Sequence, residues 1–254
     1  MRKLVYILLL LFAFTHVGLA QNRQLFDAAT EAYNAGDYQK AIDSYLEILD
    51  NGQHSASLYY NLGNTYYKLN QIAPSIYYYE KALLLKPNDP EIKNNLSYAR
   101  NMTLDAIDTL PETGLSKIYA TFIGALSFDQ WAYVAVVFII LFVLLYIAFY
   151  NFRYASRKRT AFVISLISLF LSIGAALFAY LQYDAFMSDN PAIVFAEEVS
   201  VKSEPNKKSQ ELFALHEGTK VNILDQLNGW KRIRIADGTT GWIPAEDIKV
   251  LKDF

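Results

Sequence analysis

Two long uncharged segments constrain the fold of this chain more than any other feature of its sequence. No charged residue occurs between Gln130 and Phe152, and none occurs between Thr160 and Tyr183. Each run exceeds the ~20 apolar residues that a helix needs to cross the hydrocarbon core of a bilayer. We therefore expect two transmembrane helices, over residues 129–151 and 160–183, joined by the short loop 152–159.

The loop between these segments predicts their orientation. It contains four positive charges and no negative one, at Arg153, Arg157, Lys158 and Arg159. Short loops rich in Lys and Arg stay in the cytoplasm. We therefore expect loop 152–159 to be cytoplasmic and both long flanking regions to lie on the outer face of the membrane.

The N-terminus indicates export independently of that rule. The basic start Met1–Lys3 precedes an uncharged run from Leu4 to Asn22, and Gly18-Leu19-Ala20 places small residues where a signal peptidase cleaves. Residues 1–20 are therefore predicted to be a signal peptide. An uncleaved membrane anchor is the alternative, because the run approaches the length of one span.

The second predicted transmembrane helix carries a row of small residues at spacings of three or four. They are Ala161, Ser165, Ser168, Ser172, Ala176 and Ala179. Such a row lets two helices approach closely in lipid. We expect it to pack on the first transmembrane helix, because consecutive elements joined by a short loop usually lie side by side; a homodimer face is the alternative.

Residues 21–102 repeat with a period of 34 residues, the length of one helix-turn-helix unit. The aligned pairs are Gly36 with Asn70, Ala41 with Ser75, Ile42 with Ile76, Tyr45 with Tyr79, and Ile48 with Ala82. The second unit resembles the tetratricopeptide repeat (TPR) family in Tyr59-x2-Leu62-Gly63-x2-Tyr66, Ser75-x3-Tyr79, Ala82 and Pro87. In this pattern the small residues Gly63 and Ser75 are expected where two helices approach most closely.

The first unit has Ala28, Ala29 and Ala32 where the TPR pattern has larger residues or Gly, and it is interpreted as the N-terminal end of the array. A third helix is expected to begin at Pro90 and to cap the array, because Pro is favoured in the first turn of a helix. Residues 103–128 are interpreted as a linker followed by a short interfacial helix.

Residues 192–252 differ in composition and predict short strands. Turn signals at Glu217-Gly218, Asn228-Gly229 and Asp237-Gly238 separate runs in which apolar and polar residues alternate. Ile233 and Ile235 are expected on a buried face, with Arg232 and Arg234 on the other. The segment resembles the bacterial SH3 (SH3b) family in Val201-Lys202-Ser203-Glu204-Pro205, Glu217–Val221, Gly229-Trp230 and Gly241-Trp242-Ile243-Pro244, with Lys202 where that family often has Arg.

Composition makes several functional classes improbable. The chain has no cysteine and three separated histidines, so no metal site and no cofactor are predicted. A formal net charge of -2 gives no support to a nucleic-acid partner. No catalytic residues are predicted: His216 is interpreted as a residue at the rim of the barrel, and the acids Asp105, Asp108, Glu197 and Glu198 are interpreted as exposed.

Protein binding is the function that remains. The inner face of the array is expected to present Tyr33, Asn34, Tyr60, Asn64, Tyr67, Lys68, Asn94 and Tyr98. Tyr and Asn side chains offer both hydrogen bonds and apolar surface to an extended peptide; for Tyr60 and Tyr67 a packing role is the alternative. Trp230 and Trp242 are expected in the core of the SH3-like domain rather than on a ligand-binding surface.

The expected fold is a multidomain membrane protein with an all-α TPR array, a two-helix transmembrane hairpin and a small all-β SH3-like barrel. In this order of domains the chain resembles the E-type proteins of the Bacteroides aerotolerance (Bat) operon. That resemblance implies a periplasmic inner-membrane scaffold acting with von Willebrand A-domain membrane proteins and a MoxR-type ATPase in envelope stress tolerance. A peptidoglycan-binding sensor or anchor and an accessory to a cell-wall hydrolase are the alternatives.

Overall fold

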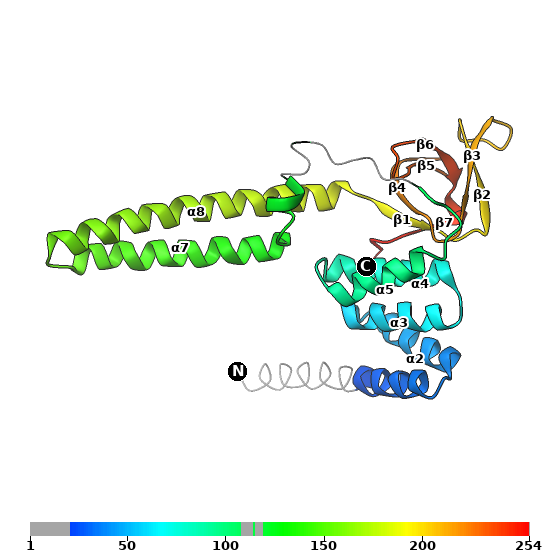
Figure 1. Ribbon diagram of the computed structural model, residues 1–254, viewed down its shortest axis with the longest axis horizontal. Coiled ribbons are helices and arrows are strands. Elements are labelled where there is room, and N and C mark those ends of the chain that lie inside the picture. The colour runs from blue at the N-terminus through cyan, green and yellow to red at the C-terminus, as the bar shows by residue number, and fades with distance from the viewer. Residues whose placement is uncertain (1–20, 108–113, 115–118, 254) are drawn as a thin grey trace, which may run out of the picture. The chain divides into compact units, whose positions relative to one another are not determined.

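The computed structural model describes residues 21–107, 114 and 119–253 (Figure 1). Of the described residues, 21–107 and 190–253 form one compact unit, and 114 and 119–189 form the other. The predicted signal peptide, residues 1–20, lies outside the described residues, as does Asp108.

The first unit begins with five helices that follow the predicted repeat. Residues 21–34 are helical and are followed by α2 (Tyr38–Asp50), α3 (Ala56–Lys68), α4 (Ile72–Leu85) and α5 (Pro90–Arg100). Equivalent positions of the two units are buried alike, in the pairs Ala41/Ser75, Ile42/Ile76, Tyr45/Tyr79 and Ile48/Ala82. The aligned turn residues Gly36 and Asn70 both adopt positive φ, at 83° and 59°. The 34-residue repeat is therefore confirmed.

The small residues of the second repeat lie where two of its helices touch. A Cβ atom on Gly63 of α3 would lie 2.6 Å from the ring of Tyr79 on α4. The Ser75 hydroxyl, fully buried on α4, donates a hydrogen bond to the Gly63 carbonyl at 2.9 Å. Larger residues at either position would separate the helices, as the sequence pattern predicts.

The C-terminal part of the first unit is a seven-stranded antiparallel sheet, the SH3-like domain. Its strands are β1 (Pro191–Val194), β2 (Glu198–Lys202), β3 (Glu211–His216), β4 (Lys220–Leu227), β5 (Trp230–Arg234), β6 (Thr240–Pro244) and β7 (Ile248–Val250), with the short helix η2 (Ala245–Asp247) before β7. The strand order is β3-β2-β6-β5-β4-β1-β7. Irregular pairing after Val201 and after Ile223 bends the sheet.

The alternation predicted for this domain is confirmed in β5 and just after it. Ile233 and Ile235 are buried in one core cluster, whereas Arg232 and Arg234 are exposed. Asn228 and Gly229 both have positive φ, as a two-residue hairpin turn requires. The runs predicted from sequence are Val194-Phe195, Val199–Val201, Thr219–Leu224, Trp230–Ile235 and Gly241–Ile243. Strands β3 and β7 are not among them, and β7 has only three residues, too few to give a period.

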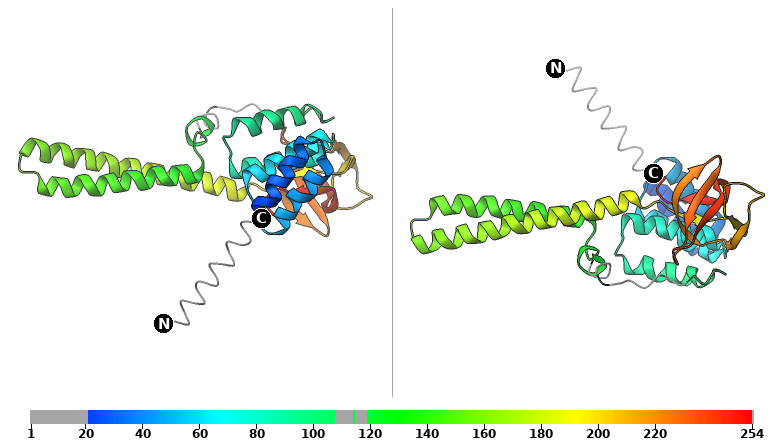
Figure 2. Two further views of the ribbon diagram at one scale, coloured as in Figure 1. Left: turned by 90° about the horizontal axis from the view of Figure 1, so that it is seen from below. Right: turned by 90° about the horizontal axis from the view of Figure 1, so that it is seen from above.

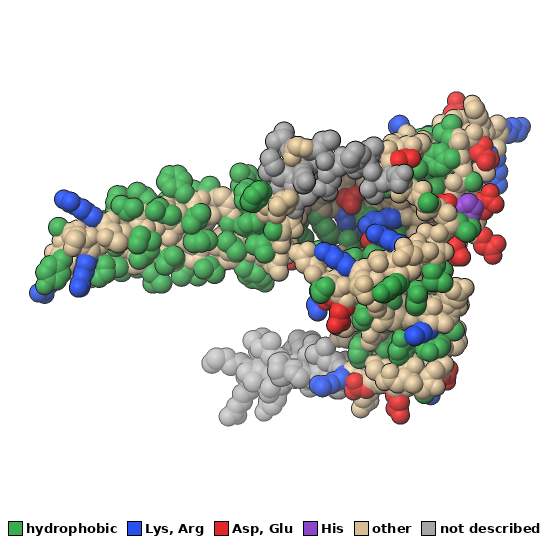
Figure 3. Space-filling model, viewed as in Figure 1, with side chains coloured by type: hydrophobic (Ala, Val, Ile, Leu, Met, Phe, Trp, Pro, Cys, Tyr) green, Lys and Arg blue, Asp and Glu red, His purple; other side chains and the backbone are tan. Residues whose placement is uncertain are grey.

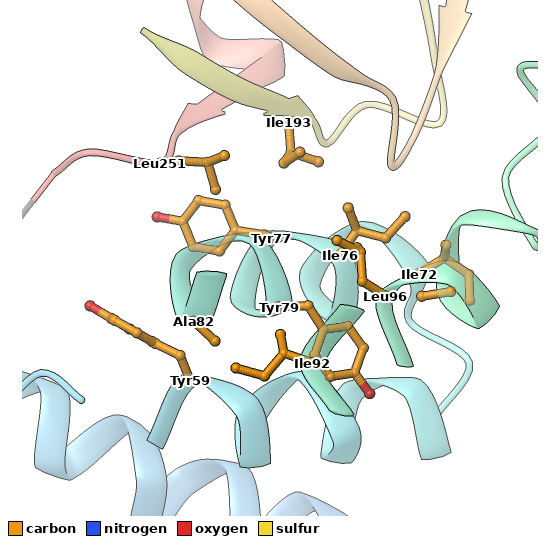
Figure 4. Close-up of a cluster of buried hydrophobic side chains, with 11 residues drawn as sticks. Tyr59, Ile72, Ile76, Tyr77, Tyr79, Ala82, Ile92, Leu96, Ile193 and Leu251 are labelled. Carbon is orange, nitrogen blue, oxygen red and sulfur yellow. The ribbon is translucent and has the colours of Figure 1, made fainter. Parts of the chain in front are cut away.

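The array and the SH3-like domain share one hydrophobic cluster. Ile193 of β1 and Leu251 after β7 are fully buried against Ile76 of α4, and Tyr77 of α4 is buried beside them (Figure 4). Around them lie Tyr59, Ile72, Tyr79, Ala82, Ile92, Leu96 and Ala99. Two repeats and a capping helix bury little surface alone, and here the SH3-like domain covers the outer side of α4.

The second unit is a helical hairpin. Helix α7 (Phe128–Asn151) and helix α8 (Ala155–Ser188) run side by side in every view (Figures 1 and 2). Both are long and apolar enough to be candidate membrane spans. Hydrophobic side chains cover the visible surface of the hairpin, and Lys and Arg side chains lie at its loop end (Figure 3).

Most of the small-residue row on α8 packs toward α7. Ala161, Ser165, Ser168 and Ser172 are buried, and the Ser172 hydroxyl donates to the Ala135 carbonyl of α7 at 2.8 Å. The prediction was wrong for the next members: Ala176 is exposed and Ala179 is half-buried, whereas Ala175 is buried. At 3.6 residues per turn, a helix keeps one face buried when steps of four and three residues alternate. The step of four from Ser168 to Ser172 is therefore followed by a step of three to Ala175, and a second step of four to Ala176 leaves the buried face.

The segment expected to be an interfacial helix contains the short π-helix η1 (Tyr119–Ile123). The Ile123 carbonyl accepts hydrogen bonds from the Trp131 ring of α7 at 2.9 Å and from the Gln182 amide of α8 at 2.6 Å. These bonds fix η1 to the end of the hairpin that lies opposite the basic loop.

Candidate protein-binding groove and its supporting interface

A cavity of about 310 Å³ opens between the first helices of the array and α5. It is lined by Tyr33, Tyr60, Asn64, Tyr67, Lys68, Tyr79, Asn95 and Tyr98, and we call it the groove. Helix α3 contributes Tyr60, Asn64 and Tyr67, whose spacings of four and three place them on one helix face. The groove therefore arises directly from the repeat pattern.

Hydrogen bonds hold the floor of the groove in place. Asn64 Oδ1 accepts from the Tyr79 hydroxyl at 2.6 Å and from Asn95 Nδ2 at 2.9 Å. Asn95 Nδ2 also lies 2.9 Å from the Tyr60 hydroxyl, which accepts from it. Since these residues come from α3, α4 and α5, the network fixes three helices relative to one another.

Six of the eight residues predicted for the inner face line the groove: Tyr33, Tyr60, Asn64, Tyr67, Lys68 and Tyr98. Asn34 and Asn94 are exposed and lie outside its lining. Sequence reasoning missed Tyr79 and Asn95. Tyr79 matches a core position of the repeat, and the helical spacing of Asn95 with Ile92 and Leu96 indicated packing rather than exposure to a cavity.

The groove is suited to neutral hydrogen bonding. Burial raises the pKa of Tyr33 and that of Tyr79, so their phenol groups stay protonated and can donate. Lys68 is the only charged residue of the lining and is exposed. The arrangement offers aromatic surface, hydroxyl groups and one positive charge to a peptide segment.

A buried carboxylate links the array to the SH3-like domain behind the groove. Glu80 of α4 is 4% exposed and accepts from the Arg100 guanidinium of α5 and from Lys220 Nζ of β4, the latter at 2.8 Å. A buried charge is costly unless it is paired, and here both partners are partly exposed cations. Glu80 therefore joins three elements of the first unit.

The next residue of α4, Lys81, forms a second ion pair. Lys81 is 5% exposed and pairs with Asp253, which also accepts from the Tyr77 hydroxyl at 2.8 Å. Burial alone would raise the pKa of Asp253, but the hydrogen bonds from Lys81 and Tyr77 outweigh it and the pKa is lowered. The C-terminal segment is thus tied to α4 by charge as well as by Leu251.

A third polar contact with the SH3-like domain is made by Asp105, which follows α5 in the chain. Asp105 accepts from the Thr219 hydroxyl at 2.5 Å, the His216 backbone amide at 2.8 Å and His216 Nδ1 at 2.7 Å. The prediction that Asp105 is an exposed acid was wrong: its side chain is 11% exposed. Burial opposes ionisation of Asp105, yet these hydrogen bonds lower its pKa, and the bond to Asp105 raises the pKa of His216.

This His–Asp–Thr arrangement lacks the geometry of a nucleophilic triad. The Thr219 hydroxyl donates its proton to Asp105, so it is not hydrogen-bonded to the ring of His216 that would have to activate it. Among the described residues there is also no cluster of three or more His, Asp or Glu side chains able to hold a metal ion. The contact acts as a clamp between the two domains.

The two tryptophans of the SH3-like domain do not belong to its core, so the expectation that they do was wrong. Trp230 and Trp242 are half-buried and lie outside the buried cluster. Trp242 pairs with Arg232 on one side and with Lys202 on the other, on the face opposite the buried Ile243. Because side chains alternate along a strand, the burial of Ile243 places Trp242 outward.

The four residues predicted to determine topology, Arg153, Arg157, Lys158 and Arg159, lie in and just after the loop between α7 and α8. Three of them are exposed and Lys158 is half-buried. Arg157 lies over the ring of Tyr154, and Lys158 over that of Phe149, at 5.4 and 5.7 Å from the ring centroids.

Comparison with protein families agrees with these two folds. Residues 56–89 match the tetratricopeptide repeat family, and residues 197–249 match the bacterial SH3 domain family. A search of the curated proteins found no match to the chain. The chain is thus a multidomain protein with a helical TPR region, two candidate membrane helices and an all-β SH3-like domain, and both matched domains are of a kind that usually binds rather than catalyses.

Proposed function

We propose that this protein is a non-enzymatic inner-membrane scaffold that binds segments of other proteins in its groove. The observation that carries the proposal is the cavity of tyrosine and asparagine side chains on the inner face of the array. Its floor is fixed by hydrogen bonds among three helices, so the surface is preorganised for a ligand.

The proposed topology places the array and the SH3-like domain in the periplasm, with loop 152–159 in the cytoplasm. Two crossings return the chain to the side from which it started. The shared cluster of Ile76, Tyr77, Ile193 and Leu251 supports this arrangement, because domains with a common core must lie on the same side of a bilayer. The positive loop supports the direction.

The resemblance to the E-type Bat proteins suggests the biological setting. In this proposal the partners are von Willebrand A-domain membrane proteins, with a MoxR-type ATPase in the same system, and the complex serves envelope stress tolerance. The domain order supports this proposal, since the two family matches flank the pair of candidate membrane helices.

The test uses exposed groove residues, because Asn64 has structural hydrogen bonds whose loss would disturb packing. The double variant Lys68→Ala/Tyr98→Ala should reduce recovery of cross-linked partners from intact cells at least tenfold, as expected for anchor residues. The matched control is Asn34→Ala/Asn94→Ala, which changes exposed residues outside the lining and should leave recovery unchanged. Equal recovery with both double variants would refute binding in the groove.

Peptidoglycan binding by the SH3-like domain is a second candidate function. The specific observation in its favour is the outward position of Trp242 between Lys202 and Arg232, since indole rings stack on sugars and cations pair with carboxylates. The full-length protein should then sediment with purified sacculi, and Trp242→Ala should abolish this. Sedimentation that is absent, or unaffected by the substitution, would exclude this candidate.

A further inference from the structure

A second cavity lies at the loop end of the hairpin, within the second unit. Its volume is about 270 Å³, and its lining includes Leu145 of α7, Phe152 of the loop, and Ser156, Arg157, Thr160 and Ile164 of α8. We call it the loop-end cavity. Its lining has two chemical halves: Leu145, Phe152 and Ile164 are apolar, whereas Ser156, Arg157 and Thr160 carry polar groups.

The charge around the loop-end cavity has one sign. Asp129 and Asp184 are the nearest acidic residues in the sequence, at the other end of each helix, while Arg153, Arg157 and Lys158 lie in or beside the loop together with Arg159. Within the described residues, none of these cations forms an ion pair with a carboxylate. The positive charge is therefore available to an anion from outside the chain.

The polar half can act on such an anion in two ways. Arg157 is held over the Tyr154 ring, which orients its guanidinium without neutralising it. The Ser156 hydroxyl has no hydrogen-bond partner within the described part of the chain and can donate. The Thr160 hydroxyl donates to the Ser156 carbonyl at 3.1 Å, so it remains an acceptor only.

We propose that the loop-end cavity binds an anionic phospholipid, with the phosphate at Arg157 and Ser156 and an acyl chain along Leu145 and Ile164. The inference rests on the membrane crossing in the proposed function but not on partner binding in the groove. A helix of 24 residues is about 36 Å long, so loop 152–159 lies at the level where headgroups meet acyl chains. A soluble polyanion would satisfy the charge but would leave the apolar half unfilled.

The experiment is lipid titration of the full-length protein in detergent, followed by native mass spectrometry. The probes are dioleoyl phosphatidylglycerol and dioleoyl phosphatidylcholine, which share acyl chains and differ in net charge. Each basic residue near an anionic lipid changes binding by about fivefold. The protein should retain phosphatidylglycerol at least fivefold more tightly than phosphatidylcholine, and millimolar inorganic phosphate should not displace it.

Two variants with equal loop charge test the site. Arg157→Gln removes the cation that lines the cavity and should weaken phosphatidylglycerol binding about fivefold. Arg153→Gln removes a cation of the same loop outside the lining and should change binding less than twofold. A third variant, Ser156→Trp, fills the cavity at an exposed position and should also weaken binding.

The following results would overturn the proposal. Equal affinity for the two lipids would show that charge is not recognised, and equal losses in Arg157→Gln and Arg153→Gln would reduce the effect to general loop charge. Displacement by inorganic phosphate, or full binding by Ser156→Trp, would show that the acyl chain does not occupy the cavity. Because detergent removes the need for correct membrane insertion, these outcomes do not depend on topology or on the partner of the groove.

Discussion

Three consecutive tyrosines on α4 have three different environments, although they are identical in sequence. The hydroxyl of Tyr77 donates to Asp253 at the SH3-like domain, and the hydroxyl of Tyr79 donates to Asn64 at the groove. Between them the Tyr78 ring stacks on Tyr66, with centroids 5.5 Å apart and planes 5° from parallel. One side of α4 thus supports the groove, and the other side is buried in the interface with the SH3-like domain.

The comparison shows that residue type alone does not distinguish a binding surface from a packed one. At the interface, each charge of Glu80, Lys81 and Asp105 has a partner, and the apolar side chains are buried. In the groove, Lys68 and Tyr98 remain exposed to an incoming ligand. Substitutions at the interface should therefore change stability, whereas substitutions of exposed groove residues should change binding.

The largest effect is expected for Ile76→Ala. Ile76 is fully buried between the array and the SH3-like domain, so truncation should lower the free energy of unfolding by ~3 kcal/mol. Leu85→Ala changes an exposed residue of the same helix and should cost about 0.5 kcal/mol or less. The unfolding transition is followed by helical circular dichroism and by the fluorescence of Trp230 and Trp242, in a Trp131→Phe background. The midpoints seen by the two signals should shift together.

A shift of the helical signal alone would contradict this prediction. It would mean that the SH3-like domain unfolds independently and that the shared cluster does not couple the two domains.

A smaller loss is expected for Gly218→Ala. Gly218 has φ near 86°, and an added Cβ would lie 2.8 Å from Thr103 and 3.0 Å from Ile76. Backbone strain and close contact together should cost ~2 kcal/mol in thermal or urea unfolding. Gly229→Ala is the matched control, because φ is 79° and the space around it is open, so only the strain of about 1 kcal/mol remains. Equal costs at both positions would argue against a tight interface at Gly218.

Tyr77→Phe should be milder still. The substitution keeps the ring and removes the hydroxyl that donates to Asp253, so a loss of about 1.5 kcal/mol is expected for a hydrogen bond to a charged group. Tyr78→Phe keeps the stacked ring and should stay within about 0.5 kcal/mol of the parent protein in the same unfolding assay. If both variants are equally stable, the hydrogen bond from Tyr77 to Asp253 contributes nothing to stability.

The smallest effect is the pH dependence of the Asp105–His216 clamp. The pKa of His216 is raised by Asp105, with Glu198 adding to it, so the stability it contributes is complete below pH 6.5 and is lost as pH rises through the raised value. The pKa of Asp105 is lowered, so its contribution is lost only as pH falls below 3.8. Unfolding temperature should therefore fall from pH 5.5 to 8.5, and His216→Gln should remove this part of the change. An unchanged pH profile in the variant would refute the clamp.

Much of this fold could be predicted from sequence because its signals are local. The 34-residue repeat, the uncharged runs and the Asn228-Gly229 turn each act through neighbouring residues, and each is confirmed as structure. The groove lining was largely predicted for the same reason, since Tyr60, Asn64 and Tyr67 share a helix face. Their role in binding remains a prediction.

The domain interface could not be predicted, because its partners are far apart in the chain. Tyr77 contacts Asp253, Asp105 contacts His216, and Glu80 contacts Lys220. In each pair the hairpin segment lies between the two residues in the sequence. Nothing in the local sequence around Glu80 distinguishes it from an exposed acid of an amphipathic helix. The error at Trp242 has a related cause, since which side of a strand is covered depends on the register of its neighbours.

The central claim, that the array and the SH3-like domain form one body on one side of the membrane, can be tested by cross-linking. The chain has no cysteine, so Arg100→Cys/Lys220→Cys introduces a unique pair at two partly exposed residues that contact the same Glu80 carboxylate. The pair is made together with Glu80→Gln, so that no buried charge is left without a partner. Spheroplasts are treated with a short membrane-impermeant bismaleimide, and Arg153→Cys serves as the control for the cytoplasmic loop. We predict an intramolecular cross-link in the pair and no labelling of the control until the membrane is permeabilised. Labelling of only one cysteine of the pair in intact spheroplasts would contradict the account.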